Sequence, residues 1–279
     1  MQGLRERGYV EGQNLVIEHR YADGNFAQLP NLAAELVRFK VDVIVASGTP
    51  STRAAQHATK QIPIVMTVVG TPVGLFVTSL AKPGGNITGL TQISRDLTGK
   101  RLELLKEAFP KITRVAHLIN TAGTAEEYRR RIQQRHALAE ALGLKMLIME
   151  ASDPEPDFDG AFRIAAKERT DALMIGPGPL VDSHRERVVK LAVKSRLPAI
   201  YSGIDFVDVG GLMSYGPEFN DLYRRAAIFV DKILKGANPA DLPVEQPTKF
   251  EFAINLKAAK QIGVTIAPQV LMDADRVIK

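Results

Sequence analysis

The residues best suited to bind a small molecule are hydroxyl groups in two related turns. Ser47-Gly48-Thr49-Pro50-Ser51 follows a β-branched run, and Gly70-Thr71-Pro72 repeats the Gly-Thr-Pro pattern after the next run. Threonine before proline is typical of a helix N-terminus, where the side chain caps free N–H groups. Two such helix starts would offer hydroxyls, N–H donors and a positive dipole end to a carboxylate. The alternative is that both threonines only cap their helices.

An acidic candidate lies in the second half of the chain. Asp205 comes a few residues after the apolar run 199–201, beside Tyr201 and Phe206. A carboxylate next to aromatic rings is an arrangement that binds an ammonium group. The alternative interpretation of Asp205 is an acid that stabilises the first turn of a helix.

Signatures of catalysis and of metal binding are missing from the sequence. It contains no G-x-G-x-x-G, no G-x-x-x-x-G-K-[ST] and no G-x-S-x-G, and its five histidines share no metal-binding spacing. The absence of cysteine removes thiolate nucleophiles and cysteine-ligated metals. We therefore expect no catalytic residues, no metal and no cofactor, although a Ser-His-Asp set drawn from distant loops is not excluded by sequence.

Short β-branched runs alternate with longer helical patterns nearly from end to end. This alternation predicts an α/β protein with parallel sheets and helices on both faces. The expected strands are 15–19, 41–46, 64–68, 87–90, 115–119, 145–149, 172–175, 199–201, 212–215 and 250–254. The expected helices are 29–39, 50–60, 72–80, 98–108, 125–142, 158–167, 183–194 and 220–234.

The 279 residues are enough for two lobes. A turn cluster at 81–86, a break at 216–217 and a proline-bracketed segment at 238–248 predict three crossings between them. We expect an N-terminal lobe of residues 1–90 plus 217–247. The C-terminal lobe is then 91–216 plus 248–279. Two doubly wound lobes joined three times can rock about the crossings as a hinge.

The start of the sequence has a helix without a strand before it. Residues 2–7 have a helical pattern and 15–19 form the next expected strand, whereas a βαβ unit places a strand first. We therefore expect the first strand of the N-terminal lobe to be missing from a shortened start. The opening residues also lack the apolar stretch of a secretory signal.

Charge does not favour a nucleic-acid partner. The chain has 36 Lys and Arg against 31 Asp and Glu, a net charge of +5 spread along its length. The one dense run, Arg129 to Arg131 with Arg135, has the spacing of a solvated helix face. No apolar stretch reaches the length of a membrane span.

Whole phrases of the sequence resemble one protein family. They are QGLRERGYVEGQNLVIEHRYADG from Gln2, LAKPGGNITGL from Leu80, GLMSYGP from Gly211 and ILKGANPADLPVEQPTKFEFAINLKAAKQIG from Ile233. These residues resemble the ABC-transporter substrate-binding proteins of the tryptophan/tyrosine type. The resemblance implies a periplasmic-binding-protein type I fold, no catalysis, a location outside the cytoplasm, and delivery of a captured solute to an ABC permease and its ATPase. Membrane contact would then come only through the permease or a lipid anchor that this chain lacks.

The resemblance also implies which loops line the ligand cleft. Together with the turns described above, it gives these expected ligand-binding residues: Ser47, Gly48, Thr49, Ser51, Gly70, Thr71, Asn120, Gly176, Pro177, Tyr201, Ser202, Asp205 and Tyr215. Two positions depart from the family pattern. The family often has Asp where this chain has Thr71, and an Asp-Pro pair followed by bulky residues near 177–180, where this chain has Gly-Pro-Gly-Pro. The identity of the ligand therefore stays open.

The combined interpretation is a solute-binding component of an ABC importer. A small solute, expected to be an amino acid and in some relatives an aromatic one, would sit between the lobes and close them. Ser47, Thr49 and Ser51 would bind its carboxylate, Asp205 its ammonium, and Tyr201, Phe206 and Tyr215 would form apolar walls. The alternatives are a cytosolic ligand-sensing domain of a regulator with the same fold, and a doubly wound transferase.

Overall fold

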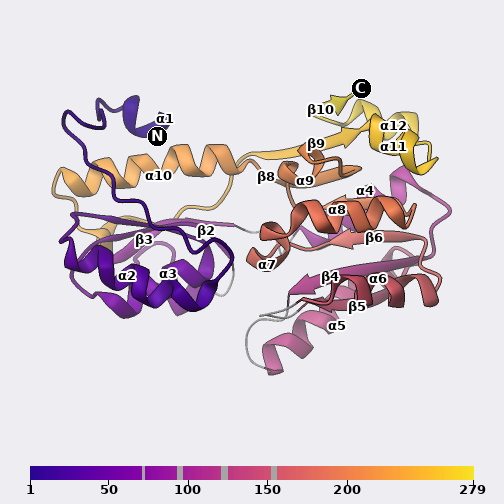
Figure 1. The fold of residues 1–279 in the computed structure, drawn as a ribbon, viewed down its shortest axis with the longest axis horizontal. Coiled ribbons are helices and arrows are strands. Elements are labelled where there is room, and N and C mark those ends of the chain that lie inside the picture. Colours follow the sequence, from indigo (N-terminus) through magenta and orange to yellow (C-terminus); the bar gives the residue numbers. More distant parts are fainter. Residues whose placement is uncertain (71–72, 93–96, 121–124, 152–155) are drawn as a thin grey trace. The chain divides into compact units, whose positions relative to one another are not determined.

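The computed structural model describes residues 1–70, 73–92, 97–120, 125–151 and 156–279, and it divides into two compact units (Figure 1). Unit 1 consists of Met1–Ile93 and Glu218–Lys249, and unit 2 of Ser94–Pro217 and Phe250–Lys279. The chain therefore passes between the units three times.

Unit 1 contains a three-stranded parallel sheet. Its strands are β1 (Ile44–Ser47), β2 (Ile64–Val69) and β3 (Ile87–Thr91), in the order β1-β2-β3. Helices α2 (Leu29–Arg38) and α3 (Gly48–Ala58) lie on one face, and α10 (Phe219–Leu234) lies on the other (Figure 1). The short helix α1 (Gln2–Arg5) packs on α10. The remaining helical segments are 3-10 turns at Phe26–Gln28, Val73–Leu75 and Pro239–Asp241.

The side chains of β2 explain why this sheet is covered on both faces. Successive residues of a strand point to opposite faces, so Val65 and Met66 lie in different apolar clusters. Val65 packs with the apolar stripe of α10, whose buried members recur every three or four residues: Leu222, Ala226, Phe229, Val230 and Ile233. Met66 packs with Ala55 of α3. The continuous apolar run of β2 is thus the signature of a strand buried on both sides.

One edge of this sheet, at β1, has no neighbouring strand in the described part of the chain. The N–H of Ile44 donates to Pro63 O across 2.9 Å, toward β2, so the backbone groups of Val43 and Val45 point away from β2. Among the described residues no strand pairs with β1 on that side, and Val45 is 53% exposed. The strand expected at 15–19 is wrong, because a strand needs a ladder of paired residues and only Leu15 of this segment is paired, in an isolated bridge to Glu11.

Unit 2 contains a larger sheet in the order β10-β9-β8-β7-β6-β4-β5. Its strands are β4 (Arg114–Asn120), β5 (Lys145–Ala151), β6 (Ala172–Ile175), β7 (Ala199–Tyr201), β8 (Met213–Pro217), β9 (Phe250–Asn255) and β10 (Arg276–Ile278). All neighbours are parallel except β8 and β9. The expectation of purely parallel pairing is therefore wrong at this pair. The chain leaves unit 2 along β8 and returns along β9, so the two strands run in opposite directions.

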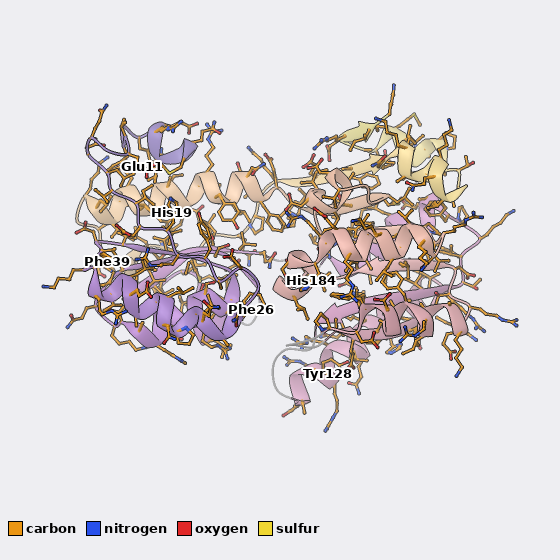
Figure 2. The ribbon with its side chains drawn as sticks, in the orientation of Figure 1. Glu11, His19, Phe26, Phe39, Tyr128 and His184 are labelled. Carbon is orange, nitrogen blue, oxygen red and sulfur yellow. The ribbon has the colours of Figure 1, made fainter. Side chains whose placement is uncertain are left out.

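Helices cover both faces of the unit 2 sheet. They are α4 (Thr98–Ala108), α5 (Ala125–Ala141), α6 (Phe158–Lys167), α7 (Pro179–Ser183), α8 (Arg185–Lys194), α9 (Ile204–Asp208), α11 (Leu256–Ile262) and α12 (Pro268–Met272). Val115 and Ala116 of β4 belong to separate core clusters, one on each face. Figure 2 shows Tyr128 on α5, whose phenol donates a hydrogen bond to Glu150 of β5. None of the helices in the described part of the chain has both the length and the apolar character to cross a membrane.

Two expected helices differ from the structure. The first residue of the helix expected at 72–80 lies outside the described part, and the chain after it forms only the 3-10 turn Val73–Leu75. The chain turns back there, because the N–H of Thr78 donates to Pro83 O at 3.0 Å. The helix expected at 183–194 begins two residues later, as α8, because the backbone of His184 leaves the helical conformation between α7 and α8.

Candidate functional site

The carboxyl end of β1 brings together hydroxyl groups from two elements of unit 1. Ser47 ends the strand, and its hydroxyl lies 2.8 Å from the hydroxyl of Tyr223 on α10. Helix α3 begins at Gly48, whose positive φ of 79° lets the chain turn sharply from strand to helix. The expected capping role of Thr49 is therefore wrong, because Thr49 lies inside the first turn. Ser51 follows in the same turn and is half-buried.

The loops after β2 and β3 lie beside this helix start. Gly70 follows β2 and Gln92 follows β3, and the N–H of Gln92 donates to Val69 O at 2.7 Å. A Cβ on Gly70 would lie 3.9 Å from both Thr49 Oγ1 and Gln92 Nε2. Three consecutive strand-end loops thus converge on one point of unit 1. Thr71 falls outside the described residues.

Unit 2 presents two carboxylates on the loops after consecutive strands. Asp205 lies on α9 after β7, and Asp182 lies on α7 after β6; both keep an exposed surface. Desolvation by the surrounding protein raises the pKa of Asp182, and the charge of Asp205 raises it further, against a hydrogen bond from the Gly178 N–H that lowers it. Two carboxylates that oppose each other's ionisation would both be stabilised by a cation.

A buried arginine fixes the strand ends beside these carboxylates. Arg101 of α4 is 1% exposed, and its Nε donates to Tyr215 O at 2.7 Å while Nη2 donates to Ser202 O at 3.3 Å. These bonds tie α4 to the ends of β7 and β8. Burial lowers the pKa of Arg101 to about 10, so the guanidinium stays charged at neutral pH.

The aromatic residues expected to form walls have different surroundings. Tyr201 is 1% exposed and stacks on Phe206 with ring centroids 5.0 Å apart, inside a core cluster of unit 2. A ring enclosed in this way presents no face to solvent, so the structure gives both residues a packing role. Ser202 is also buried, at 2%. Tyr215 is half-buried and stacks on Phe250 at 6.1 Å.

The remaining candidates follow β4 and β6. Asn120 ends β4, but its side chain lies outside the described part of the chain. Gly176 and Pro177 follow β6, and a Cβ on Gly176 would lie only 3.0 Å from Nε2 of the buried His117. Burial lowers the pKa of His117 well below 6.5, and Arg135 and Arg101 lower it further. No group of three or more potential metal ligands occurs among the described residues.

The geometry therefore leaves the expected set of residues in two groups. Ser47, Gly48, Thr49, Ser51 and Gly70 lie together at the strand ends of unit 1. Gly176, Pro177, Asp205 and Tyr215 lie at the corresponding ends in unit 2.

Residues 1–278 match the family described as ABC transporter substrate binding protein. The chain belongs to this family.

Relatives of this substrate-binding protein are known in sequence and in structure. A tyrosine-binding protein from Clostridioides difficile is 30% identical over 266 residues, which cover 95% of this chain and 75% of the relative. A conserved domain protein from Vibrio cholerae has a TM-score of 0.89 at 31% identity, covering 99% of this chain and 92% of that one. A protein from Streptococcus pneumonia in complex with L-Trp has a TM-score of 0.87 at 28% identity, with the same coverage.

These comparisons establish the class of the substrate-binding protein. The solved relatives have the periplasmic-binding-protein type I fold, and the α/β architecture agrees with them. The family captures small ligands and works with ABC transporter components, and it is not a family of enzymes. The resemblance identified from the sequence is therefore confirmed.

Three residues near the strand ends were missed by sequence reasoning. Asp182 has the same signal as Asp205, an acid in the short helix after a strand. Gln92 directly follows β3, but its segment has the polar composition of a crossing between lobes. Tyr223 lies at the exposed surface of α10 and has no sequence signal, because only folding brings it to Ser47.

Proposed function

We propose that this protein captures an amino acid outside the cytoplasm and delivers it to an ABC permease with its ATPase. In this proposal the solute binds between the units, and the units close on it about the three crossings. The family and its tyrosine- and tryptophan-binding members support the class of solute. A ligand that contacts both units favours a closed state only by its differential affinity for that state.

The observation that carries this proposal is the complementary chemistry of the two sets of strand ends. Hydroxyl groups and the start of the 11-residue helix α3 lie at the strand ends of unit 1, as a carboxylate requires. Two carboxylates lie at the strand ends of unit 2, as an ammonium requires. Ser47, Thr49 and Ser51 would bind the carboxylate of the amino acid. Asp205, with Asp182 beside it, would bind the ammonium.

The proposal also assigns contacts to the rest of the expected set. Gly48, Gly70, Thr71, Asn120, Gly176, Pro177 and Tyr215 are proposed to line the remaining surface around the solute. Tyr201 and Ser202 would support this surface from behind through their buried positions. The half-buried ring of Tyr215 would supply an apolar contact to the solute.

The test compares two acids on one helix. Asp205→Asn should weaken amino-acid binding by at least about tenfold, since it removes the charge that pairs with the ammonium. Asp208→Asn is the control, because Asp208 lies on the same helix but pairs with Arg276 at 2.9 Å. The chain contains no tryptophan, so the fluorescence of L-Trp itself reports binding. Calorimetry serves for L-Tyr and L-Phe.

Three outcomes would count against the proposal. Unchanged affinity in Asp205→Asn removes Asp205 from the site. Failure of the wild type to bind any amino acid rules out this class of solute. Small-angle scattering curves that do not change at saturating ligand would exclude closure of the units.

A further inference from the structure

Four loops of unit 2 meet at one edge of its sheet. Each loop joins the end of a helix to the start of a strand: 109–114 leads into β4, 142–145 into β5, 167–171 into β6 and 194–198 into β7. These four strands are neighbours in the sheet and run in the same direction (Figure 1). Their starts, and with them the four loops, therefore lie along the same edge.

Hydrogen bonds hold neighbouring loops together. The carboxylate of Asp171 accepts from the N–H of Thr113 at 2.7 Å and from the N–H of Arg114 at 2.9 Å. Three backbone bonds of 2.8 Å join the loops and strand starts in turn: Lys145 N–H to Thr113 O, Asp171 N–H to Arg114 O, and Leu173 N–H to Pro198 O. The four loops thus form one continuous surface with fixed relative positions.

This surface is strongly basic. The four loops contain seven Lys and Arg residues and two acids, an excess of five positive charges. The net charge of the whole chain is also +5, so the positive and negative charges outside these loops balance. All seven cationic side chains are exposed, and we call them the basic patch: Lys111, Arg114, Lys145, Lys167, Arg169, Lys194 and Arg196.

The two acids leave the basic patch largely uncompensated. Asp171 is occupied by the N–H groups that it binds between two loops. Glu168 receives a hydrogen bond from Arg114 Nη1 at 3.0 Å, but at its backbone oxygen. Within the described part of the chain, no carboxylate forms an ion pair with any member of the patch. The charges of the patch are therefore available to a partner.

Helix ends explain only part of this pattern. Lys167 and Lys194 lie in the last turns of α6 and α8, where a cation matches the helix dipole. That effect is confined to the last turn, whereas Lys111 and Lys145 lie past the ends of α4 and α5. Arginine also occupies two positions with positive φ, 53° and 54°, where glycine would be favoured after a helix: Arg169 and Arg196.

The distribution of the charges indicates what kind of partner fits. They are spread over four loops rather than gathered around one point, as binding of a single small anion would require. A broad anionic surface can pair with all of them together, and clusters of Lys and Arg bind membranes that contain anionic phospholipids in this way. The family works with ABC transporter components, which lie in a membrane. This favours phospholipid over nucleic acid as the partner.

We propose that the basic patch binds the anionic phospholipid surface of the membrane. The contact is made by unit 2 itself and adds to any contact with the permease. It goes beyond the proposed capture of an amino acid and does not depend on the identity of the solute. The patch lies at the starts of the strands, and Asp205 and Tyr215 lie at the opposite ends. Bound lipid therefore leaves the surface proposed to contact the solute uncovered.

The experiment measures how the full chain partitions onto lipid vesicles. Sedimentation is compared for vesicles of phosphatidylcholine alone and for vesicles with about one third phosphatidylglycerol. The wild type should bind only the anionic vesicles, and the binding should weaken by about tenfold or more between low salt and about 0.5 M salt. The double variant Lys167→Glu with Lys194→Glu reverses two charges of the patch and should bind at least about tenfold more weakly.

A matched control reverses two charges elsewhere in unit 2. Arg129→Glu with Arg130→Glu changes the net charge by the same amount, on exposed residues of α5 after the carboxyl end of β4. This variant should bind anionic vesicles within about twofold of the wild type. Thermal melting reports whether each variant is folded. If the first pair impairs folding, Lys111→Glu with Lys145→Glu replaces it, because these residues lie outside the helices.

The outcomes separate this inference from its rivals and from the proposed function. A wild type that binds both kinds of vesicle equally, or neither, overturns the inference. Equal losses in the patch variant and the α5 variant also overturn it, since net charge alone would then account for binding. Tighter binding to DNA of random sequence than to anionic vesicles would assign the patch to nucleic acid instead. Amino-acid binding is measured on the same variants, and its presence or absence tests the proposed function independently.

Discussion

The two units differ in how firmly they support their strand-end loops. Unit 2 has a seven-stranded sheet with an extensive core cluster on each face. In the part of unit 1 that the structure describes there are three strands, no strand beside the outer edge of β1, and a helix α2 that fully buries only Ala33. Regions with fewer buried contacts open at lower free energy. The hydroxyl-bearing loops therefore rest on the softer unit, and the carboxylate-bearing loops rest on the stiffer one.

The largest loss of folding stability should come from adding a methyl group at Gly216, where it would press against the backbone of unit 2. A Cβ on Gly216 of β8 would lie 1.9 Å from Ser202 O. Both atoms belong to the sheet and its adjoining loop, so neither can move without breaking strand pairing. We expect Gly216→Ala to destabilise unit 2 by about 3 kcal/mol or more, the range for severe core strain, in thermal or urea unfolding.

The matched substitution in unit 1, Gly3→Ala, also places a Cβ against a backbone oxygen, but on a short helix that can move. A Cβ on Gly3 of α1 would lie 2.4 Å from Arg224 O of α10. Helix α1 has only four residues and can move away from α10 as a body. We expect Gly3→Ala to cost less than about 1 kcal/mol. Equal costs for the two alanines would contradict the difference between the units.

A loss of folding stability of intermediate size should arise from His117 in unit 2 as the pH falls. The pKa of His117 is lowered well below 6.5 by burial and by two arginines. Below about pH 6.5 the unfolded chain binds a proton that folded His117 does not, so His117 contributes a loss of stability of up to about 1.4 kcal/mol per pH unit. Asp182, whose pKa is raised to about 7, binds a proton in the folded state over the same range and opposes this loss, so the contribution of His117 is read as the difference between the wild type and His117→Gln. This loss should be absent from His117→Gln when unfolding is followed between about pH 7 and pH 5.

The control for this effect lies in unit 1. His57→Gln changes an exposed histidine of α3 and should leave the slope of stability against pH as it is in the wild type. A His117→Gln protein with the wild-type slope would show that another group causes the loss of stability.

The smallest loss of folding stability should come from removing a surface ion pair of unit 1, between Arg20 and Glu35. Arg20 Nε lies 2.7 Å from Glu35 of α2, and its guanidinium stacks over Phe39 at 5.0 Å. Both side chains of the ion pair are partly exposed, so solvent screens their attraction. We expect Glu35→Gln to cost about 0.5 kcal/mol in urea unfolding, a cost that disappears in high salt. A cost above about 2 kcal/mol would mean that α2 is held more firmly than its burial indicates.

Much of the fold could be predicted from the sequence, because most elements carry a local signal. Strands such as β6 and β7 and helices such as α6 were placed at the residues where the structure has them. The strand expected at 15–19 failed, since pattern alone does not show whether a partner strand lies beside it. The antiparallel β8–β9 pair failed because strand direction depends on the path of the chain between units.

The candidate site was less predictable than the fold. Loops after strands could be named from the sequence, but the direction of a side chain could not. Tyr201 has the same residue type and neighbours whether it lines a surface or fills a core, and only the central position of β7 in the sheet decides this. Gln92 became a candidate because folding brings its carboxamide beside Gly70, a proximity that depends on residues far apart in the sequence.

The side of β1 that no described strand covers has a practical consequence for handling this polypeptide. A bare strand edge is a template on which the edge of another molecule can assemble. The strand has only four residues, which limits how firmly two copies can join. Concentrated stocks should therefore form weak, dilution-reversible dimers, and scattering or crystallisation samples are best prepared as a dilution series.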